Sequence, residues 1–184
     1  MRIITGKARG VKLATLPGED TRPTAERVKE AVFSAIQFET AGRVVLDLFG
    51  GSGQMALEAL SRGAARAVVV DVSKKAADVI RANAIKTGLF DDCRVICADW
   101  RDFLRSASGK GAFSLVFLDP PYKPLFLDEV IKRALAADII TKDAIIVCES
   151  AEDSIPAPVD GFVSRLYKYG KVYVTVLRAE EGTD

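Results

Sequence analysis

The chain has 184 residues, of which 49% are hydrophobic and 28% charged, and its formal net charge is +1. This length is typical of one domain, or of one domain with a small extension, and a net charge near zero excludes a whole-molecule field that would attract nucleic acid or an anionic membrane. The sequence contains no histidine, which excludes histidine general bases, Ser–His and Cys–His nucleophile pairs and histidine-containing metal sites.

The three cysteines, Cys93, Cys97 and Cys148, lie in apolar stretches without CxxC spacing. An odd, sparse set of this kind is typical of reduced intracellular proteins and offers no zinc site. The N-terminus has no apolar leader segment, and no apolar run approaches the length of a membrane span. We therefore expect a cytoplasmic protein that binds no metal and no membrane, with a monomer as the default state.

The first 40 residues differ from the rest of the chain. Residues 2–5 and 11–15 are short extended stretches on either side of a turn that begins and ends with glycine, a pattern that predicts a β-hairpin. Pro23 suits the first turn of an amphipathic helix that reaches about Phe38. We expect residues 1–40 to form a hairpin-and-helix extension.

From residue 43 onward, apolar strands alternate with helical stretches, and we expect residues 41–184 to form one α/β domain. The strands are continuously apolar, as in a parallel sheet covered by helices on both faces. The tail predicts an antiparallel hairpin over 162–168 and 171–177, joined at Tyr169-Gly170. The expected fold is a seven-stranded doubly wound, Rossmann-like sheet. Its other strands are predicted at 44–48, 67–70, 94–98, 114–118 and 144–148, and its helices at about 53–61, 73–87, 99–106 and 126–137.

A glycine-rich turn follows the first of these strands. Gly51-x-Gly53-x-x-Ala56 fits the dinucleotide-binding fingerprint, in which glycines let the backbone approach a ligand at a helix N-terminus. Asp71 ends the next strand, where its carboxylate can accept hydrogen bonds from a ribose diol. The alternative, a tight turn that merely requires glycine, leaves Asp71 unexplained. The pattern predicts a ribose-bearing cofactor.

Acidic residues around this turn favour S-adenosylmethionine over a nicotinamide dinucleotide. Asp47, just before the glycines, suits the ammonium group of a methionyl end better than a pyrophosphate. Asp99 and Trp100 follow the third strand, where an adenine would lie, although Asp99 also suits a helix N-cap and both roles can coexist. The expected cofactor-binding residues are Asp47, Phe49, Gly50, Gly51, Ser52, Gly53, Asp71, Val72, Asp99 and Trp100.

Asp119-Pro120-Pro121-Tyr122 follows the fourth strand of the sheet. The carboxyl ends of such strands form the ligand crevice, so these residues are expected to face the cofactor as catalytic residues. Asp119 and the Pro120 carbonyl offer acceptors to an NH2 group, the prolines remove two N–H donors, and Tyr122 offers a ring on which a base can stack. The arrangement predicts methyl transfer to an exocyclic base amine. A plain Pro-Pro loop with a surface tyrosine is the alternative.

These four residues resemble the (Asp/Asn)-Pro-Pro-(Tyr/Phe) motif of amino-methyltransferases. The chain as a whole resembles the RsmD family, bacterial methyltransferases of guanine N2 in small-subunit ribosomal RNA, from residue 2 to about 177. The matching stretches are Arg2-Ile3-Ile4-x-Gly6-x-x-Arg9-Gly10-x-x-Leu13, Thr21-Arg22-Pro23-Thr24-x-x-Arg27-Val28-x-Glu30, Asp47-Leu48-Phe49-x-Gly51-Ser52-Gly53, Leu57-Glu58-Ala59-Leu60-Ser61-Arg62-Gly63-Ala64 and Tyr169-Gly170.

The resemblance implies a class I methyltransferase that uses S-adenosylmethionine. It also implies a guanine of 16S rRNA as acceptor, with guanine 966 as the expected position, in an assembled or partly assembled 30S subunit. Two departures are small: Gly50 stands where the family commonly has alanine, and Gln54-Met55 replaces a usually smaller pair. We expect them to alter only how the methionyl end packs.

The resemblance also gives the basic N-terminal residues a role in contacting RNA phosphates. These residues are Lys7, Arg9, Lys12, Arg22 and Arg27. Without the resemblance, a solvated surface hairpin would explain them as well. The basic residues of the terminal hairpin, Arg165, Lys168, Lys171 and Arg178, are interpreted as ordinary exposed strand residues.

Three other functions compete with this interpretation. An adenine-N6 DNA methyltransferase shares the Asp119–Tyr122 chemistry, but the chain has no room for a separate DNA-recognition domain. A nicotinamide-dependent reductase leaves Asp119–Tyr122 unexplained. An RNA-binding assembly protein without catalysis would keep the basic hairpin but would not need Asp119.

Overall fold

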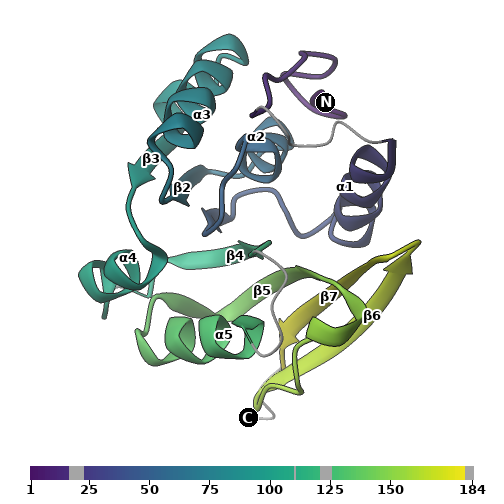
Figure 1. The fold of residues 1–184 in the computed structure, drawn as a ribbon, viewed down its shortest axis with the longest axis vertical. Helices are drawn as coiled ribbons and strands as arrows, with labels where there is room; N and C mark the ends of the chain where they lie inside the picture. Colours follow the sequence, from purple (N-terminus) through teal and green to yellow (C-terminus); the bar gives the residue numbers. More distant parts are fainter. Residues whose placement is uncertain (17–22, 110, 121–125, 181–184) are drawn as a thin grey trace.

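One seven-stranded sheet runs through the centre of the computed structural model, which describes residues 1–16, 23–109, 111–120 and 126–180 (Figure 1). The strand order is β3-β2-β1-β4-β5-β7-β6. The strands are β1 (Val44–Asp47), β2 (Arg66–Asp71), β3 (Cys93–Cys97), β4 (Phe113–Leu118), β5 (Ile140–Ser150), β6 (Phe162–Tyr169) and β7 (Val172–Ala179).

The first five strands are parallel, and β7 inserts antiparallel between β5 and β6. The order of the parallel strands reverses between β1 and β4, where Asp47 is in register with Phe117. In sheets of this kind the crevice beyond such a reversal binds the ligand. The doubly wound sheet with its terminal antiparallel hairpin confirms the fold predicted from the sequence.

Helices cover both faces of the sheet (Figure 1). They are α1 (Pro23–Ala35), α2 (Gln54–Ser61), α3 (Lys74–Lys86), α4 (Trp100–Ala107) and α5 (Phe126–Ala136), with 3-10 turns at Phe90–Asp92 and Glu152–Ser154. Residues of α1, α2 and α3 share one apolar core with the N-terminal residues and one face of the sheet. Residues of α4 and α5 form a second core on the other face. None of the described helices combines the length and the apolar character needed to cross a membrane.

Two elements differ in length from the prediction. Strand β5 begins at Ile140, four residues early, because Ile140 pairs with Phe113 across an irregularity in the β4–β5 ladder. Helix α1 ends at Ala35, because Arg178 donates to the Ala35 carbonyl (3.0 Å) and binds the Glu39 carboxylate at the end of the helix (2.8 Å). Arg178 is therefore a half-buried helix-capping residue, and its interpretation as an ordinary exposed strand residue was wrong.

The N-terminal residues form a hairpin with one antiparallel bridge, between Arg2 and Lys12. The ladder does not extend along residues 2–5 because the N–H groups of Ile4 and Thr5 donate to the Glu58 carboxylate at 2.7 and 3.0 Å. Gly6 packs so closely on the end of α2 that a Cβ there would lie 1.8 Å from the Ser61 carbonyl oxygen. The hairpin is thus fastened to α2.

Candidate cofactor and substrate site

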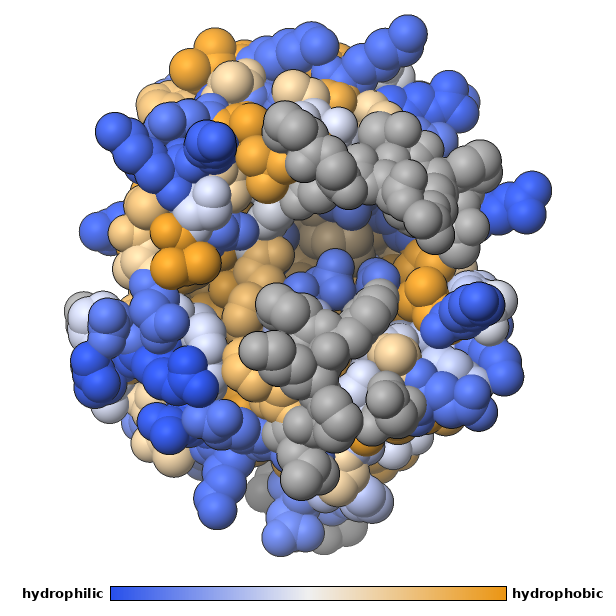
Figure 2. Space-filling view, in the orientation of Figure 1, coloured by the Kyte–Doolittle hydropathy of each residue, from blue (hydrophilic) through white to orange (hydrophobic). Residues whose placement is uncertain are grey.

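A cavity of about 750 Å³ opens at the carboxyl edge of the sheet, where β1 and β4 end. Figure 2 shows it as a hollow with mostly apolar walls. Nine of the ten predicted cofactor-binding residues line it, together with Asp119 and Pro120 of the predicted catalytic motif. The structure therefore brings the two sequence motifs to one place.

The glycine turn holds the backbone against the cavity. Gly51 and Gly53 have φ angles of 52° and 77°, a region in which glycine avoids the strain that a side chain would cause. The Gly50 N–H donates to the Val70 carbonyl at 2.9 Å, which fastens the turn to β2. Gly53 is absent from the cavity lining and packs on Ile80 as the N-cap of α2. Its place in the site is therefore indirect.

The Asp71 carboxylate is fixed by two backbone hydrogen bonds. Its Oδ2 accepts from the Gly51 N–H at 2.9 Å and its Oδ1 from the Ser73 N–H at 2.8 Å. Each carboxylate oxygen keeps a further lone pair. Asp71 thus offers a pre-oriented acceptor to hydroxyl groups in the cavity, and Val72 beside it is exposed and also lines the cavity.

Asp47 is buried beneath the same turn, with 3% of its surface exposed. Burial raises the pKa of its carboxyl to about 7, and the nearby Asp71 charge adds to the increase. Backbone hydrogen bonds from Ala56 and Phe49 act against this rise. A cation bound beside this carboxyl would strongly stabilise its ionised form and lower its pKa.

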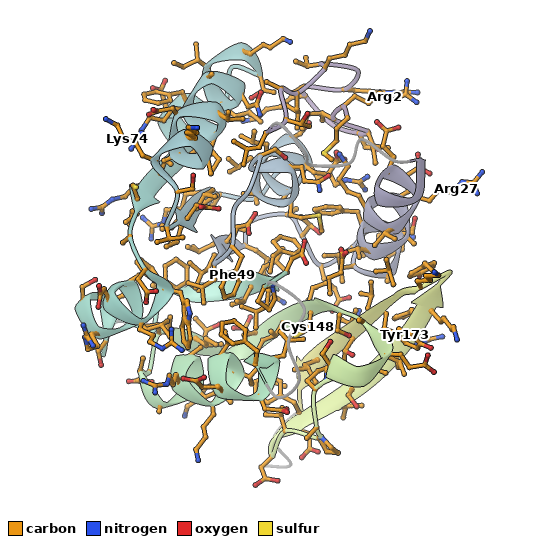
Figure 3. The ribbon with its side chains drawn as sticks, viewed as in Figure 1. Arg2, Arg27, Phe49, Lys74, Cys148 and Tyr173 are labelled. Atoms are coloured by element: carbon orange, nitrogen blue, oxygen red, sulfur yellow. The ribbon has the colours of Figure 1, made fainter. Side chains whose placement is uncertain are left out.

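Aromatic rings form one wall of the cavity. The Phe49, Trp100 and Phe126 rings contact one another with centroids 5.8–6.4 Å apart, and Phe49 lies between the two helix layers in Figure 3. The Arg101 guanidinium covers one side of the Trp100 ring at 4.4 Å. Asp99 is the N-cap of α4, accepting from the Arg101 N–H at 2.8 Å, and also lines the cavity. Phe126 escaped the sequence analysis because no motif marks it.

The structure describes only part of the predicted catalytic motif. Asp119 is exposed and Pro120 buried, and both line the cavity. Pro121 and Tyr122 lie outside the described residues, as does Arg22 of the predicted RNA-contacting set.

The opposite wall comes from α1 and the N-terminus, through Met1, Val28, Lys29 and Val32. Lys29 is 1% exposed, and its Nζ donates to the Arg2 carbonyl at 2.6 Å. Lys29 was missed by the sequence analysis, although a lysine between Val28 and Val32 on a helix that packs against the core is a signal that could have found it.

Asn83 of α3 joins the N-terminal residues to the glycine turn. Its side-chain amide donates to the Ala14 and Ser52 carbonyls, both at 2.9 Å, and its oxygen accepts from the Ala14 N–H at 2.8 Å. Asn83 is 1% exposed and its hydrogen bond to Ser52 is buried, whereas Ala14 is exposed.

The predicted RNA-contacting residues lie on the surface. Arg9, Lys12 and Arg27 are exposed and form no ion pair with any residue the structure describes, whereas Lys7 lies 3.5 Å from the Asp92 carboxylate. Figure 3 shows Arg27 of α1 pointing outward on the same side as Arg2 of the hairpin. Across the described ranges, no group of three or more Cys, Asp or Glu residues could hold a metal ion.

Comparison with known proteins adds to this geometry. Residues 1–178 match the family described as Conserved hypothetical protein 95. The chain is 34% identical to the Bacillus subtilis protein YlbH over 181 residues, which cover 97% of this chain and 98% of YlbH. It is 33% identical over 155 residues to ribosomal RNA small subunit methyltransferase D of Haemophilus influenzae, covering 83% and 80% of the two chains. The solved structure of Escherichia coli YhhF superposes with a TM-score of 0.86 at 29% identity over 99% of each chain.

Proposed function

The chain belongs to the Conserved hypothetical protein 95 family, the RsmD family, and from this premise we propose that it methylates the exocyclic N2 amine of a guanine in 16S rRNA. The methyl donor is S-adenosylmethionine. The substrate is the assembled or partly assembled 30S subunit, the expected position is guanine 966, and the enzyme acts as a cytoplasmic monomer. The sheet, with its antiparallel β7, has the class I methyltransferase fold.

The observation that carries this proposal is the shared cavity of the glycine turn and Asp119. Since Asp47 and Phe117 are in register on neighbouring strands, the chain leaves β1 toward the glycine turn beside the point where β4 leads to Asp119. A donor held by the turn and an acceptor held by Asp119 would therefore meet across the β1–β4 boundary. Holding two reactants in line lowers the free-energy barrier of the reaction by about 7–11 kcal/mol.

The residues present fit S-adenosylmethionine. Asp71 suits the ribose hydroxyls, Asp47 suits the methionyl ammonium, and the aromatic wall suits the adenine. Gln54 also lines the cavity, and its Oε1 is buried without a hydrogen-bond partner among the described residues. Because an unsatisfied buried acceptor costs about 1–3 kcal/mol, an ammonium group that donates to Gln54 would remove this cost. Bound there, the cofactor supplies an electrophilic methyl group.

The chain's own part in the transfer is to position the amine. The Asp119 carboxylate and the Pro120 carbonyl accept one hydrogen each from the guanine NH2, which turns the nitrogen lone pair toward the methyl group. The lone pair would form the new N–C bond to the donated methyl group, whose former bonding electrons would leave with the donor. The alkylated nitrogen would then pass one proton to the Asp119 carboxylate that accepts its hydrogen bond. Pro121 and Tyr122 keep the roles assigned from the sequence, a donor-free corner and a stacking surface.

Substrate binding is assigned to residues 1–40 as an RNA-contacting extension of the domain formed by residues 41–184. Its basic residues Lys7, Arg9, Lys12, Arg22 and Arg27 would contact phosphates beside the cavity. Exposure of Arg9, Lys12 and Arg27 supports this assignment.

The test is methyl transfer from labelled S-adenosylmethionine to three substrates in parallel: unmodified 30S subunits, protein-free 16S RNA and duplex DNA. Mass analysis of the nucleosides should yield N2-methylguanosine from the ribosomal substrate. N6-methyladenine in DNA would move the function to the adenine-N6 alternative. Binding of cofactor without transfer to any of the three would contradict the proposed substrate.

A further inference from the structure

The outermost strand of the sheet, β6, carries a row of side chains that the site described above does not use. Arg165, Tyr167 and Tyr169 alternate along the strand and therefore share one face. The rings of Tyr167 and Tyr169 are stacked, with centroids 6.4 Å apart and planes 10° from parallel. The Arg165 guanidinium lies 5.2 Å from the centre of the Tyr167 ring. We call these three residues the β6 row.

The β6 row begins next to the cavity. Tyr167 is paired with Val174 of β7, and Val174 is paired with Glu149 of β5. Both Val174 and Glu149 line the cavity. Since directly paired residues of neighbouring antiparallel strands share a face, Tyr167 lies one strand spacing, about 5 Å, beyond the cavity wall. The last residues of β6 also lie at the same edge of the sheet as the carboxyl end of β5.

The Tyr167 and Tyr169 rings are fixed by packing, but part of each ring is accessible to solvent. Tyr167 and Tyr169 are half-buried and pack against the core that contains Val174, and Arg165 is exposed. Burial raises the pKa of the Tyr169 hydroxyl, so this ring stays neutral near pH 7. The row is therefore a fixed aromatic surface that ends in an exposed cation.

The β6 row carries one cation, Arg165, which is exposed and forms no ion pair with a residue that the structure describes. Lys168 alternates with the row along the strand and therefore faces the other side, where its Nζ lies 4.9 Å from the centre of the Tyr173 ring. A surface that combines aromatic rings with an exposed guanidinium is complementary to a single-stranded nucleic acid, whose bases stack and whose phosphates are anionic.

We propose that the β6 row is a stacking platform for a single-stranded nucleotide next to the target guanine. This proposal rests on the proposed function and deepens it, because a base extruded into the cavity leaves its neighbours partly unstacked. The tyrosine rings of the β6 row stack on a neighbouring base that has lost its contact with the extruded guanine, and Arg165 contacts a phosphate. Arg165 is thereby more than the ordinary exposed strand residue that the sequence suggested.

Two variants test the platform in the full chain. Tyr169→Leu keeps an apolar side chain against the core but removes the ring, and Arg165→Gln removes the cation at an exposed position. Tyr167→Phe retains the ring and serves as the control for stacking. Arg66→Gln removes a matched exposed arginine at the amino end of β2, the opposite edge of the sheet.

The first measurement is the Kd for a fluorescein-labelled oligoadenylate RNA, with thermal unfolding to verify the fold of each variant. We expect Tyr169→Leu to raise Kd about tenfold, the weakening typical of removing one base–aromatic stack. We expect Arg165→Gln to lower the slope of log K against log salt by about 0.7. Arg66→Gln should stay within about twofold of the parent chain, and Tyr167→Phe, which keeps the ring, should weaken binding less than Tyr169→Leu.

The second measurement, KM and kcat with 30S subunits, separates the two proposals. A parent enzyme that methylates 30S subunits, with KM and oligonucleotide Kd unchanged in both platform variants, would overturn the platform alone. A parent chain that binds the oligonucleotide through the row but methylates no ribosomal RNA would overturn the proposed function alone. A dimer formed through β6 and abolished by Tyr169→Leu, with no effect on RNA binding, would overturn the platform in favour of a protein interface.

Discussion

Lys29 and Glu58 form an ion pair inside the protein, with Nζ and Oε2 3.8 Å apart and side chains 1% and 0% exposed. Burial lowers the pKa of Lys29 despite the attraction of Glu58. The Glu58 carboxylate also accepts hydrogen bonds from the Arg62 side chain at 2.8 Å and from the backbone N–H groups of Ile4 and Thr5. One charged pair therefore fastens α1, α2 and the N-terminal hairpin together.

Replacing Glu58 should leave the buried Lys29 ammonium without its ion-pair partner. We expect Glu58→Gln to lower the free energy of unfolding by about 3–5 kcal/mol in urea titrations. Arg81→Ala is the control, because Arg81 and Asp78 form an exposed pair at 3.1 Å that contributes less than about 1 kcal/mol. Similar losses in both variants would show that the buried pair contributes no more to stability than an exposed pair.

Cofactor binding should depend on pH through Asp47. Its pKa in the free protein, about 7, is above the ordinary value of 3.8, so the folded chain favours the protonated form. The raised pKa means that protonation of Asp47 stabilises the folded chain relative to the unfolded chain. This stabilisation is fully present below pH 3.8 and is lost as pH rises through 7. A bound ammonium group needs the ionised form, so affinity for S-adenosylhomocysteine should increase between about pH 6 and 8, as calorimetry can measure.

Two controls test whether Asp47 is the source of this pH dependence. Methylthioadenosine lacks the ammonium group, and its affinity should change little over the same range. Asp47→Asn should remove the pH dependence for S-adenosylhomocysteine, and no histidine is present to titrate in this range. The same pH profile in Asp47→Asn as in the parent chain would exclude Asp47 as its source.

Gly50 is required by its neighbours in the core. A Cβ at this position would lie 2.4 Å from Val69 Cγ1 and 3.0 Å from Ile80 Cδ1. Gly50→Ala should therefore lower the free energy of unfolding by about 1–3 kcal/mol. In the double variant with Val69→Ala, which vacates that space, the loss should be smaller than the sum of the two single losses in a double-mutant cycle. Additive losses would exclude this clash as the cause.

The sequence predicted the sheet and the glycine turn because both depend on local patterns. Apolar runs mark the strands, and Asp47, the glycines and Asp71 follow a fixed spacing. The direction of the missing Gly50 side chain was not predictable, because it depends on Val69, 19 residues later in the chain. A larger residue at this position would press on the core, while the expected effect of Gly50 on methionyl packing stays a prediction.

The Lys29–Glu58 pair and the aromatic wall were missed for a related reason. Lys29 and Glu58 lie far apart in sequence and meet only because α1 packs near α2, and Phe126 lines the cavity only because of where α5 packs. The early start of β5 was missed because Thr141, Lys142 and Asp143 are polar. These residues are strand only because Ile140 pairs with Phe113.

The proposed role of Asp119 predicts that its loss impairs catalysis without impairing cofactor binding. Asp119→Ala should lower the methyl-transfer rate by at least about 100-fold, since one well-placed polar partner is worth about 3 kcal/mol in the transition state. The Kd for S-adenosylhomocysteine should stay within about twofold. Asp119→Asn, which keeps an acceptor oxygen, should retain intermediate activity. An equal loss of cofactor binding in Asp119→Ala would refute its assignment to the target base.

Charge on the N-terminal hairpin should govern substrate affinity. Reversing Arg9 and Lys12 to glutamate should raise the Kd for 30S subunits and reduce the salt slope by about 0.7–0.9 for each phosphate that is no longer neutralised. Lys142→Glu is the control, because Lys142 is exposed near the start of β5 and lies outside the N-terminal extension. Comparable weakening by Lys142→Glu would indicate a nonspecific charge effect.

The place of β7 between β5 and β6 has a consequence for synthesis of the chain. Strand β6 is made before β7 but pairs only with β7 among the described strands. During translation, β6 therefore has no partner strand until residues up to Ala179 have left the ribosome. The parallel part of the sheet is complete in sequence at Ser150, so its five strands can pair before the terminal hairpin has been synthesised.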